Sequence, residues 1–337
     1  MCSWGDTWYL GRIPLSPLDY EEVYSEVSQL SSESSRRRSV QRTITGYLFL
    51  SPAIVFYTIF LVIPVGMSVY ISFRKWNMLV PLSSSAFIGL KNYQDLFRDE
   101  MFICAVKNTL VWAIGTVFIG MLIALIIALL ILNVKWAPFW RFLIFAPVVT
   151  PLVAVARIWS SGIYKTSGGM LNSILAMMHL PPQHWLADSR IALFSIMAVA
   201  IWASVGSTVI VFTAGLKGIP DEYYQAAKID GANAWHEFCN VTLPLLRPTI
   251  LFLSVTGLIG AWQAFDLVFQ MGAGGTQSGV SSVRSIILLN VYLYQMAFQN
   301  LRMGRATAGA FVLFLIILCF TFVVLKVLRE GGVESYE

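Results

Sequence analysis

The most constraining feature of this chain is a set of long apolar stretches that carry no charged side chain. Thr43–Phe73 runs for 31 residues without a charge, and Leu110–Leu132, Ile191–Gly215 and Ala306–Leu325 are uncharged over 23, 25 and 20 residues. A helix needs about 20 apolar residues to cross the hydrocarbon core of a bilayer. These stretches therefore predict four membrane-spanning helices.

Two shorter stretches complete the predicted set. Phe142–Ala156 is uncharged over 15 residues, and Thr249–Phe265 is uncharged over 17 before Asp266 interrupts its apolar continuation. A further stretch, Ile286–Phe298, is only 13 residues long, which favours an interfacial or re-entrant segment over a span. The predicted fold class is all-α: a polytopic membrane bundle of six transmembrane helices within residues 43–330.

Composition excludes several classes of protein. Hydrophobic residues make up 57% of the 337 residues and charged residues only 12%, against about 25% in soluble domains. A soluble enzyme and a disordered chain are therefore excluded. The 23 basic residues are spread along the chain, which argues against a nucleic-acid partner. The chain contains no phosphate-binding GxxxxGK[ST] loop, CxxC pair or HExxH motif, so it is expected to be no enzyme and to hold no cofactor or metal.

Basic residues beside the first span predict the orientation. Arg36, Arg37, Arg38 and Arg42 precede it, which places the N-terminus in the cytoplasm by the positive-inside rule. Six spans then return the C-terminus to the cytoplasm. Residues 1–42, with an acidic patch, a serine run and these arginines, are expected to be a flexible cytoplasmic tail.

The cytoplasmic loop between spans four and five, residues 216–248, has a pattern of its own. Pro220 fits a first helical turn, and Gly231 fits the left-handed residue that ends a helix. A second short helix, 232–240, is expected to stop at Pro244. An apolar stripe follows this second helix at three- and four-residue spacing: Ala232, Trp235, Phe238 and Cys239. The stripe either packs against the chain's own helices or docks another subunit.

This loop resembles the EAA loop of binding-protein-dependent ABC transporter permeases. That motif is Glu-Ala-Ala, three residues, Gly, nine residues and Ile-x-Leu-Pro. The chain has Gln225-Ala226-Ala227, Gly231 and Val241-Thr242-Leu243-Pro244 at the same spacing. Gln225 departs from the motif glutamate, which removes a charge but keeps a hydrogen-bonding group.

Other segments are similar to the carbohydrate-uptake, maltose-type branch of the same family. They are Gly46–Ala53, Phe87–Tyr93 with Asn108–Leu110, and Ala264–Phe269 with Gly274–Thr276. The resemblance covers about residues 38–328. It implies an inner-membrane permease that pairs with a second, different permease subunit. It also implies two cytoplasmic ATP-binding subunits and an extracytoplasmic solute-binding protein as partners, with the lipid bilayer around the spans.

The resemblance assigns ATPase-subunit docking to one set of residues in the loop. These are Gln225, Ala226, Ala227, Asp230, Gly231, Trp235, Phe238, Leu243 and Pro244. On the helix expected for span five, Trp262, Gln263, Phe265 and Asp266 combine aromatic and polar groups at helical spacing. They either pack the helix or line a substrate path, because sugar sites combine aromatic faces with hydrogen-bonding groups.

Charge indicates the class of solute. Asp266 is the only deep charge in the predicted spans, and a carboxylate there would repel an anion. A neutral sugar is therefore expected, with a glycerol-3-phosphate-type permease as the alternative. An ion-coupled secondary transporter would need more ionisable groups inside its helices.

Overall fold

The computed structural model describes residues 43–132, 134–273 and 283–330, so the predicted tail at 1–42 lies outside it. In that part of the chain, five helices are long and apolar enough to cross a membrane, and a bent pair of helices makes a sixth if it forms one span. The helices are Thr43–Ser72, Glu100–Ile131, Ala192–Lys217, Arg247–Gly272 and Met303–Lys326, and the bent pair is Ala137–Val149 with Leu152–Ile163. The predicted all-α class is confirmed.

The described part of the chain divides into two units, one up to residue 67 and one from residue 68 onward. The described part of the first unit belongs to the first span and includes the π-helical turn η1 (Thr58–Val62) and the start of α2 (Ile63–Ser72). None of the most apolar window of this span is buried within the chain. A helix that is apolar all round needs lipid or protein around it, so this one suits a bilayer.

The second unit begins with a short hairpin and the second span. Strands β1 (Arg74–Lys75) and β2 (Ala86–Phe87) pair antiparallel, with the turn η2 (Leu82–Ser84) between them, and α3 (Lys91–Phe97) follows. The second span runs through α4 (Glu100–Ile114), η3 (Gly115–Ile119) and α5 (Gly120–Ile131). This span starts ten residues before Leu110, where the uncharged stretch of the sequence begins. It does so because the Asp99 carboxylate caps the helix, accepting a 2.9 Å hydrogen bond from the Met101 N–H.

The third span is bent. Its elements are α6 (Ala137–Phe145), η4 (Ala146–Val149), α7 (Leu152–Ile158) and η5 (Trp159–Ile163), and the two halves meet at 93°. Pro151 forces Thr150 into an extended conformation and so breaks the helix. The bend packs against α9 (Ala192–Lys217) at Gly206, where a Cβ would lie 2.4 Å from the Ile144 carbonyl oxygen. Only glycine allows this approach.

The fifth span is broken as well. Helix α13 (Arg247–Trp262) ends at Trp262, and α14 (Asp266–Val268) and η7 (Phe269–Ala273) continue after a gap at 263–265. The Asn290 amide donates a 3.0 Å hydrogen bond to the Gln263 carbonyl oxygen, which satisfies one backbone group that the break frees. Trp262 and Asp266 therefore do not lie on one continuous helix, which corrects the single helix expected for span five.

The remaining helices complete the second unit. Segment 286–298 forms short helices and is not among the candidate spans, in agreement with the prediction that it is too short to cross the membrane. The elements are α8 (Met170–Met177), α10 (Asp221–Ile229), α11 (Ala234–Glu237), η6 (Phe238–Thr242), α12 (Leu243–Leu245), α15 (Val283–Ile286), α16 (Leu289–Tyr294), η8 (Gln295–Gln299) and α17 (Met303–Glu330).

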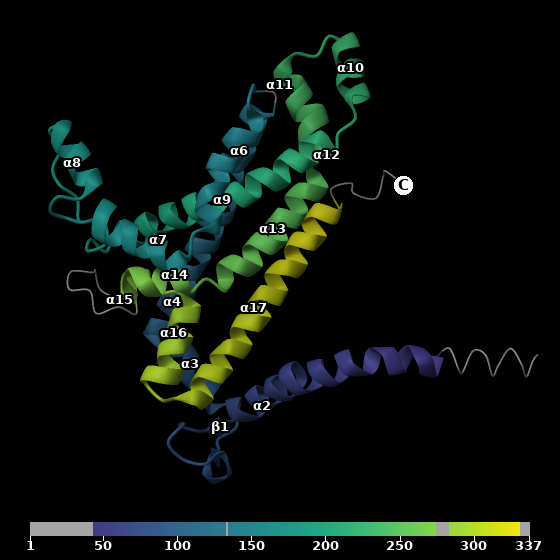
Figure 1. Ribbon diagram of the computed structural model, residues 1–337. Helices are drawn as coiled ribbons and strands as arrows, with labels where there is room; N and C mark the ends of the chain where they lie inside the picture. The colour runs from purple at the N-terminus through teal and green to yellow at the C-terminus, as the bar shows by residue number, and fades with distance from the viewer. Residues whose placement is uncertain (1–42, 133, 274–282, 331–337) are drawn as a thin grey trace, which may run out of the picture. The chain divides into compact units, whose positions relative to one another are not determined.

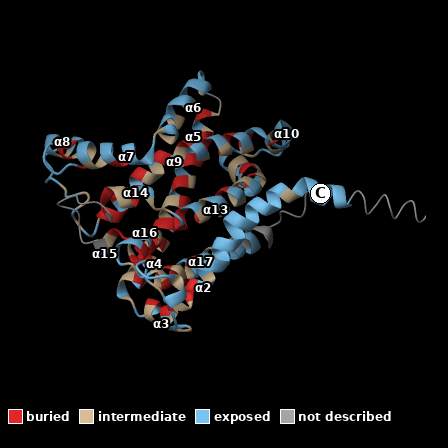
Figure 2. Cartoon of the chain, turned by 60° about the horizontal axis from the view of Figure 1, so that its bottom comes forward, coloured by how far each residue is buried: buried red, intermediate tan, exposed pale blue. Residues whose placement is uncertain are grey.

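Two buried clusters hold the second unit together. The larger one joins α4, α9, α14 and α16, and Figure 2 shows buried residues, in red, on these helices. The smaller one joins α5, the second half of α9 and the start of α13, with Phe212 and Leu246 almost fully buried. The helices α10 and α11 lie at one end of the unit, and β1 and α3 lie at the other (Figure 1).

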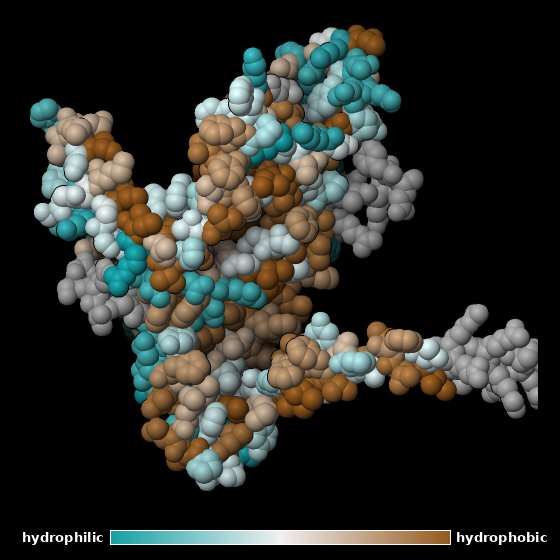
Figure 3. Space-filling view, viewed as in Figure 1, coloured by the Kyte–Doolittle hydropathy of each residue, from teal (hydrophilic) through white to brown (hydrophobic). Residues whose placement is uncertain are grey.

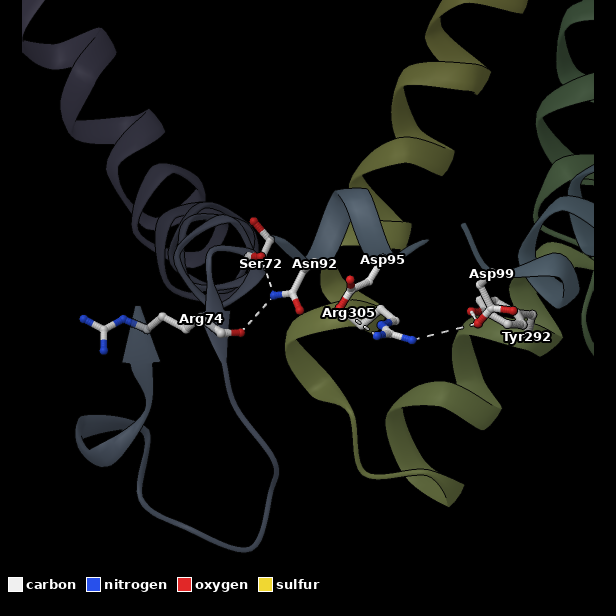
Figure 4. Close-up of polar contacts among 7 residues, drawn as sticks. All are labelled: Ser72, Arg74, Asn92, Asp95, Asp99, Tyr292 and Arg305. Atoms are coloured by element: carbon white, nitrogen blue, oxygen red, sulfur yellow. Dashed lines mark hydrogen bonds and ion pairs between the residues drawn. The ribbon is translucent and has the colours of Figure 1, made fainter. Parts of the chain in front are cut away.

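A polar clamp ties four helices together at the end that holds α3. Arg305 of α17 pairs with Asp95 of α3 at 2.9 Å and lies 4.0 Å from Asp99, which caps α4. The Asp99 carboxylate also accepts a 2.9 Å hydrogen bond from the Tyr292 hydroxyl of α16 (Figure 4). Burial raises the pKa of the Tyr292 phenol, and the hydrogen bond to Asp99 raises it further. Tyr292 therefore stays protonated and keeps donating at neutral pH. We call Asp95, Asp99, Tyr292 and Arg305 the clamp.

Candidate functional site

The loop between spans four and five folds as two short helices that meet at Gly231. Helix α10 starts after Pro220, and its C-terminal end is followed by Gly231 with φ of +79°. Few residues other than glycine adopt this backbone conformation without strain. Helix α11 starts at Ala234 because the Asn233 side chain caps it, accepting a 2.9 Å hydrogen bond from the His236 N–H.

The second helix does not stop at Pro244. It passes from α11 through η6 and α12 into α13, with Leu246 as the one residue between α12 and α13. Pro244 directly follows the π-helical turn η6, whose last hydrogen bond runs from the Leu243 N–H to the Phe238 carbonyl oxygen, and the chain stays helical past the proline. The predicted stop at Pro244 is therefore wrong, and the loop continues directly into span five.

A hollow of about 540 Å³ lies between these two helices. The Tyr224 hydroxyl and the Thr242 hydroxyl are 3.1 Å apart and tie α10 to η6. Of the predicted docking residues, Ala226, Ala227, Asp230 and Gly231 line the hollow. Tyr223, His236 and Asn240 also line it, and the sequence pattern had not singled them out. We call this space the loop hollow.

The other predicted docking residues lie around the loop hollow. Gln225 and Leu243 are exposed, Phe238 and Pro244 are partly exposed, and Trp235 is 69% exposed. The Trp235 and Phe238 rings lie 5.8 Å apart. Figure 3 shows hydrophilic side chains gathered over the tip formed by α10 and α11. Apart from its contact with Phe238 the Trp235 ring is largely exposed, and an exposed tryptophan of this kind suits contact with a partner.

A second hollow, of about 640 Å³, lies among the spans. We call it the membrane hollow. Both broken spans contribute to it, since Thr150 and Leu152 flank the bend of span three and Gln263–Asp266 covers the gap in span five. Irregular backbone at membrane depth is tolerated where it lines a cavity or is buried in protein.

Six hydroxyl side chains stand among the mainly apolar residues that line the membrane hollow. They belong to Thr116, Thr150, Ser204, Ser207, Thr208 and Thr256. Ser204, Ser207 and Thr256 each donate to a carbonyl oxygen of their own helix, at 2.9, 2.7 and 2.7 Å. A hydroxyl that donates in this way still offers lone pairs as acceptors. Among the described residues lining the hollow, Asp266 alone carries a charge.

The structure separates the four predicted path residues. Gln263, Phe265 and Asp266 line the membrane hollow, and Gln263 and Asp266 are exposed there. Trp262 does not line it: its ring lies 5.4 Å from that of Phe320 on α17 and is only 2% exposed. Phe265 also borders a separate groove of about 380 Å³ and stacks on Phe269 at 4.8 Å, so it stands between the two spaces.

Sequence comparison identifies the family. The family described as "Binding-protein-dependent transport system inner membrane component" matches residues 109–329. The chain belongs to this family. The predicted resemblance is thereby confirmed, and the chain is an inner-membrane component of a transport system that depends on a binding protein.

Two relatives and a solved structure extend the likeness over most of the chain. The chain is 33% identical over 300 residues to the probable ABC transporter permease protein YurN of Bacillus subtilis, covering 87% of this chain and 99% of the relative. It is 31% identical over 307 residues to the lactose transport system permease protein LacF of Rhizobium radiobacter, covering 89% and 98%. A bacterial ABC transporter involved in the import of the acidic polysaccharide alginate shares the fold, with a TM-score of 0.74 at 24% identity over 87% of this chain and 98% of that one.

The burial of Trp262 generates a test of its role. We expect Trp262→Ala to lower the stability of the protein by roughly 3 kcal/mol or more, because it removes a buried ring from its contact with Phe320. Thermal unfolding of the detergent-solubilised protein measures the change. Gln263→Ala, next to it but exposed in the membrane hollow, is the matched control and should leave the unfolding temperature nearly unchanged. Equal unfolding temperatures for both variants would refute the packing role.

Proposed function

We propose that this chain is the permease subunit of an ABC importer for a neutral carbohydrate. The observation that carries the proposal is the lining of the membrane hollow. It offers hydroxyl oxygens, the Gln263 amide, the Phe265 ring and one carboxylate, and none of its described lining residues is a cation. Sugar hydroxyls donate hydrogen bonds to such acceptors, and sugar rings pack on aromatic faces. The lactose permease among the relatives supports the same class of solute.

A phosphate ester fits this lining less well. A glycerol-3-phosphate-type solute needs arginine or lysine in a low-dielectric path, and Asp266 would repel it. The alternative then requires the second permease subunit to provide the cation. We therefore favour the neutral solute.

The energy for transport enters through partners. One of two cytoplasmic ATP-binding subunits docks on the loop hollow and on the exposed Trp235 of this chain, the other docks on the second permease subunit, and ATP hydrolysis belongs to these two subunits. A second permease subunit completes the path, and an extracytoplasmic solute-binding protein delivers the solute. The direct continuation of α11 through α12 into α13 supports this coupling, because a push on the loop acts on span five.

The orientation follows from the same assignment. Both termini and the loop hollow lie in the cytoplasm. In intact cells, a membrane-impermeant thiol reagent should label a single cysteine introduced as Lys107→Cys on the exposed face of α4. The native Cys239 on η6 should react only after the membrane is permeabilised. The opposite labelling pattern would invert the topology.

Gly231 allows a sharp test of docking. A Cβ on this residue would meet no atom of the chain within 4 Å, so a larger side chain there points into free space. We expect Gly231→Asp to abolish uptake and solute-driven ATP hydrolysis in the assembled complex, because the new side chain blocks the approach of the ATP-binding subunit. The backbone strain adds only about 1 kcal/mol.

The control for this experiment is Gly231→Asn, since asparagine tolerates the left-handed conformation better than most residues and adds no charge. It should retain more activity than Gly231→Asp, with both variants inserted in the membrane at equal levels. Normal coupled hydrolysis in Gly231→Asp would exclude close docking at this point.

Asp266 tests the class of solute. We expect Asp266→Asn to weaken uptake of a neutral sugar by about tenfold, because a charged acceptor binds hydroxyl donors more strongly than an amide oxygen does. Uptake kinetics in proteoliposomes that contain the full complex measure the effect, with Trp262→Phe as a variant outside the hollow. Unchanged uptake and selectivity in Asp266→Asn would remove Asp266 from the path, and transport of a phosphate ester alone would refute the charge argument.

A further inference from the structure

A third hollow lies at the end of the second unit that holds the clamp. Its volume is about 680 Å³, and it lies between the β1–β2 hairpin, α3 and the residues that lead into α17. Its lining includes groups that carry positive charge or donate hydrogen bonds, among them Lys75, Asn77, Lys91, Asn300, Arg302 and Arg305. We call this space the basic hollow. It shares no lining residue with the membrane hollow or the loop hollow, so neither of their roles accounts for it.

Polar contacts within the chain fix the floor of the basic hollow. The Asn92 amide donates to the carbonyl oxygens of Ser72 and Arg74 at 2.7 and 2.9 Å, which joins α3 to the end of α2 and to β1 (Figure 4). Asp95 of α3 accepts a 2.9 Å hydrogen bond from Arg305 of α17. The fold therefore holds the hairpin, α3 and α17 in place around the hollow.

The walls of the basic hollow carry excess positive charge. Lys75, Lys91 and Arg302 are exposed, and none of the three has an ion-pair partner among the residues whose side chains the structure describes. Asp95 is the one carboxylate among the described lining residues, and Arg305 already engages it. Three cations therefore face a shared space without a counter-charge from the described chain, which attracts an anion from outside it.

The basic hollow lies at the ends of two candidate spans. Thr43–Ser72 ends three residues before Lys75, and Met303–Lys326 begins one residue after Arg302. An extended chain covers about 3.5 Å per residue, so the Lys75 backbone lies within roughly 11 Å of the end of its helix. Lipid phosphates lie just outside the hydrocarbon core, in a layer roughly 5–8 Å thick on each side. The cations of the hollow are therefore within reach of these phosphates.

The rim of the basic hollow is apolar. Leu79 is 73% exposed and Val80 is 43% exposed, and both line the space. The indole N–H of Trp76, which also lines it, donates to the Val80 carbonyl oxygen at 2.9 Å and fixes this part of the hairpin. A free phosphate ion would pair with the cations but leave this rim in water. A phospholipid carries a phosphate and apolar chains in one molecule, so it matches both parts of the lining.

We propose that the basic hollow binds the headgroup of an anionic phospholipid such as phosphatidylglycerol. The phosphodiester anion pairs with Lys75, Lys91 and Arg302, and the acyl chains leave the hollow past Leu79 and Val80. A zwitterionic headgroup fits less well, because its own ammonium group meets the same three cations. The inference goes beyond the proposed function, since it depends on neither the solute nor the orientation of the chain in the membrane.

The test titrates the complete transporter complex, in a nonionic detergent and washed free of native lipid, with phosphatidylglycerol. Native mass spectrometry gives the dissociation constant of the tightest-bound lipid from the intensities of the complex with and without it. We expect a Lys75→Gln, Lys91→Gln, Arg302→Gln triple variant to bind this lipid about tenfold more weakly, because it loses three charges beside the phosphate. The unaltered complex should prefer phosphatidylglycerol to phosphatidylcholine with the same acyl chains by about the same factor.

The matched control is an Arg98→Gln, Lys107→Gln, Lys165→Gln triple variant. It removes the same net charge, one arginine and two lysines, from exposed positions that do not line the basic hollow. Its affinity for phosphatidylglycerol should equal that of the unaltered complex. Inorganic phosphate, at the same concentration as the lipid, should not displace phosphatidylglycerol, because it gains nothing from the apolar rim.

Three outcomes would overturn the inference. One is equal affinity of the two triple variants for phosphatidylglycerol, which would make the effect one of net charge alone. A second is equal affinity of the unaltered complex for phosphatidylglycerol and phosphatidylcholine, which would leave only apolar contact. A third is displacement of the lipid by inorganic phosphate at equal concentration, which would assign the hollow to a soluble anion.

Uptake of a neutral sugar by the same complex, reconstituted in vesicles of phosphatidylglycerol and phosphatidylcholine, tests the proposed function separately. A complex that binds phosphatidylglycerol selectively through these three cations but carries no sugar would refute the proposed function and support the lipid site.

Discussion

Everything in this fold depends on where the backbone can leave a helix inside an apolar environment. No water is present in the bilayer core to satisfy freed N–H and C=O groups, so a span stays helical unless other groups replace the lost hydrogen bonds. The second unit has two breaks within its candidate spans, at Thr150–Pro151 and at 263–265. Both border the membrane hollow. The breaks open this space and also expose backbone and side-chain polar groups to whatever enters it.

The same constraint gives the proposed coupling a mechanical path. Residues 234–262 form an almost continuous helical rod from the loop hollow to the gap in span five, and the Tyr224–Thr242 contact joins α10 to it. Under the proposed function, a displacement of the exposed loop is carried to Gln263, where the rod ends. Within the gap, Phe265 contacts Phe269 and Tyr294, so a movement of the rod would change the wall between the membrane hollow and the neighbouring groove. This is the kind of rigid-element motion that alternating access uses.

Local rules predicted much of this fold, and tertiary contacts account for the rest. Charge-free length located the spans, and glycine chemistry located the positive φ at Gly231. Proline rules failed at Pro244, because the chain stays helical past a proline that directly follows the π-helical turn η6. The gap at 263–265 depends on Asn290, which lies 27 residues after Gln263 in the sequence. No local sequence pattern indicates this contact. The hydroxyls at 204, 207 and 208 share three- and four-residue spacing and could have been recognised as one polar face within an apolar span.

Charge differs between the hollows of the second unit. The membrane hollow has a single carboxylate among its described lining residues, whereas Lys75, Lys91 and Arg302 line a hollow of about 680 Å³ beside the clamp. In a low-dielectric space the Asp266 carboxylate disfavours an anion more than a neutral molecule. The clamp joins α3 to α17 next to those cations, so the wall of the second hollow is fixed by the fold.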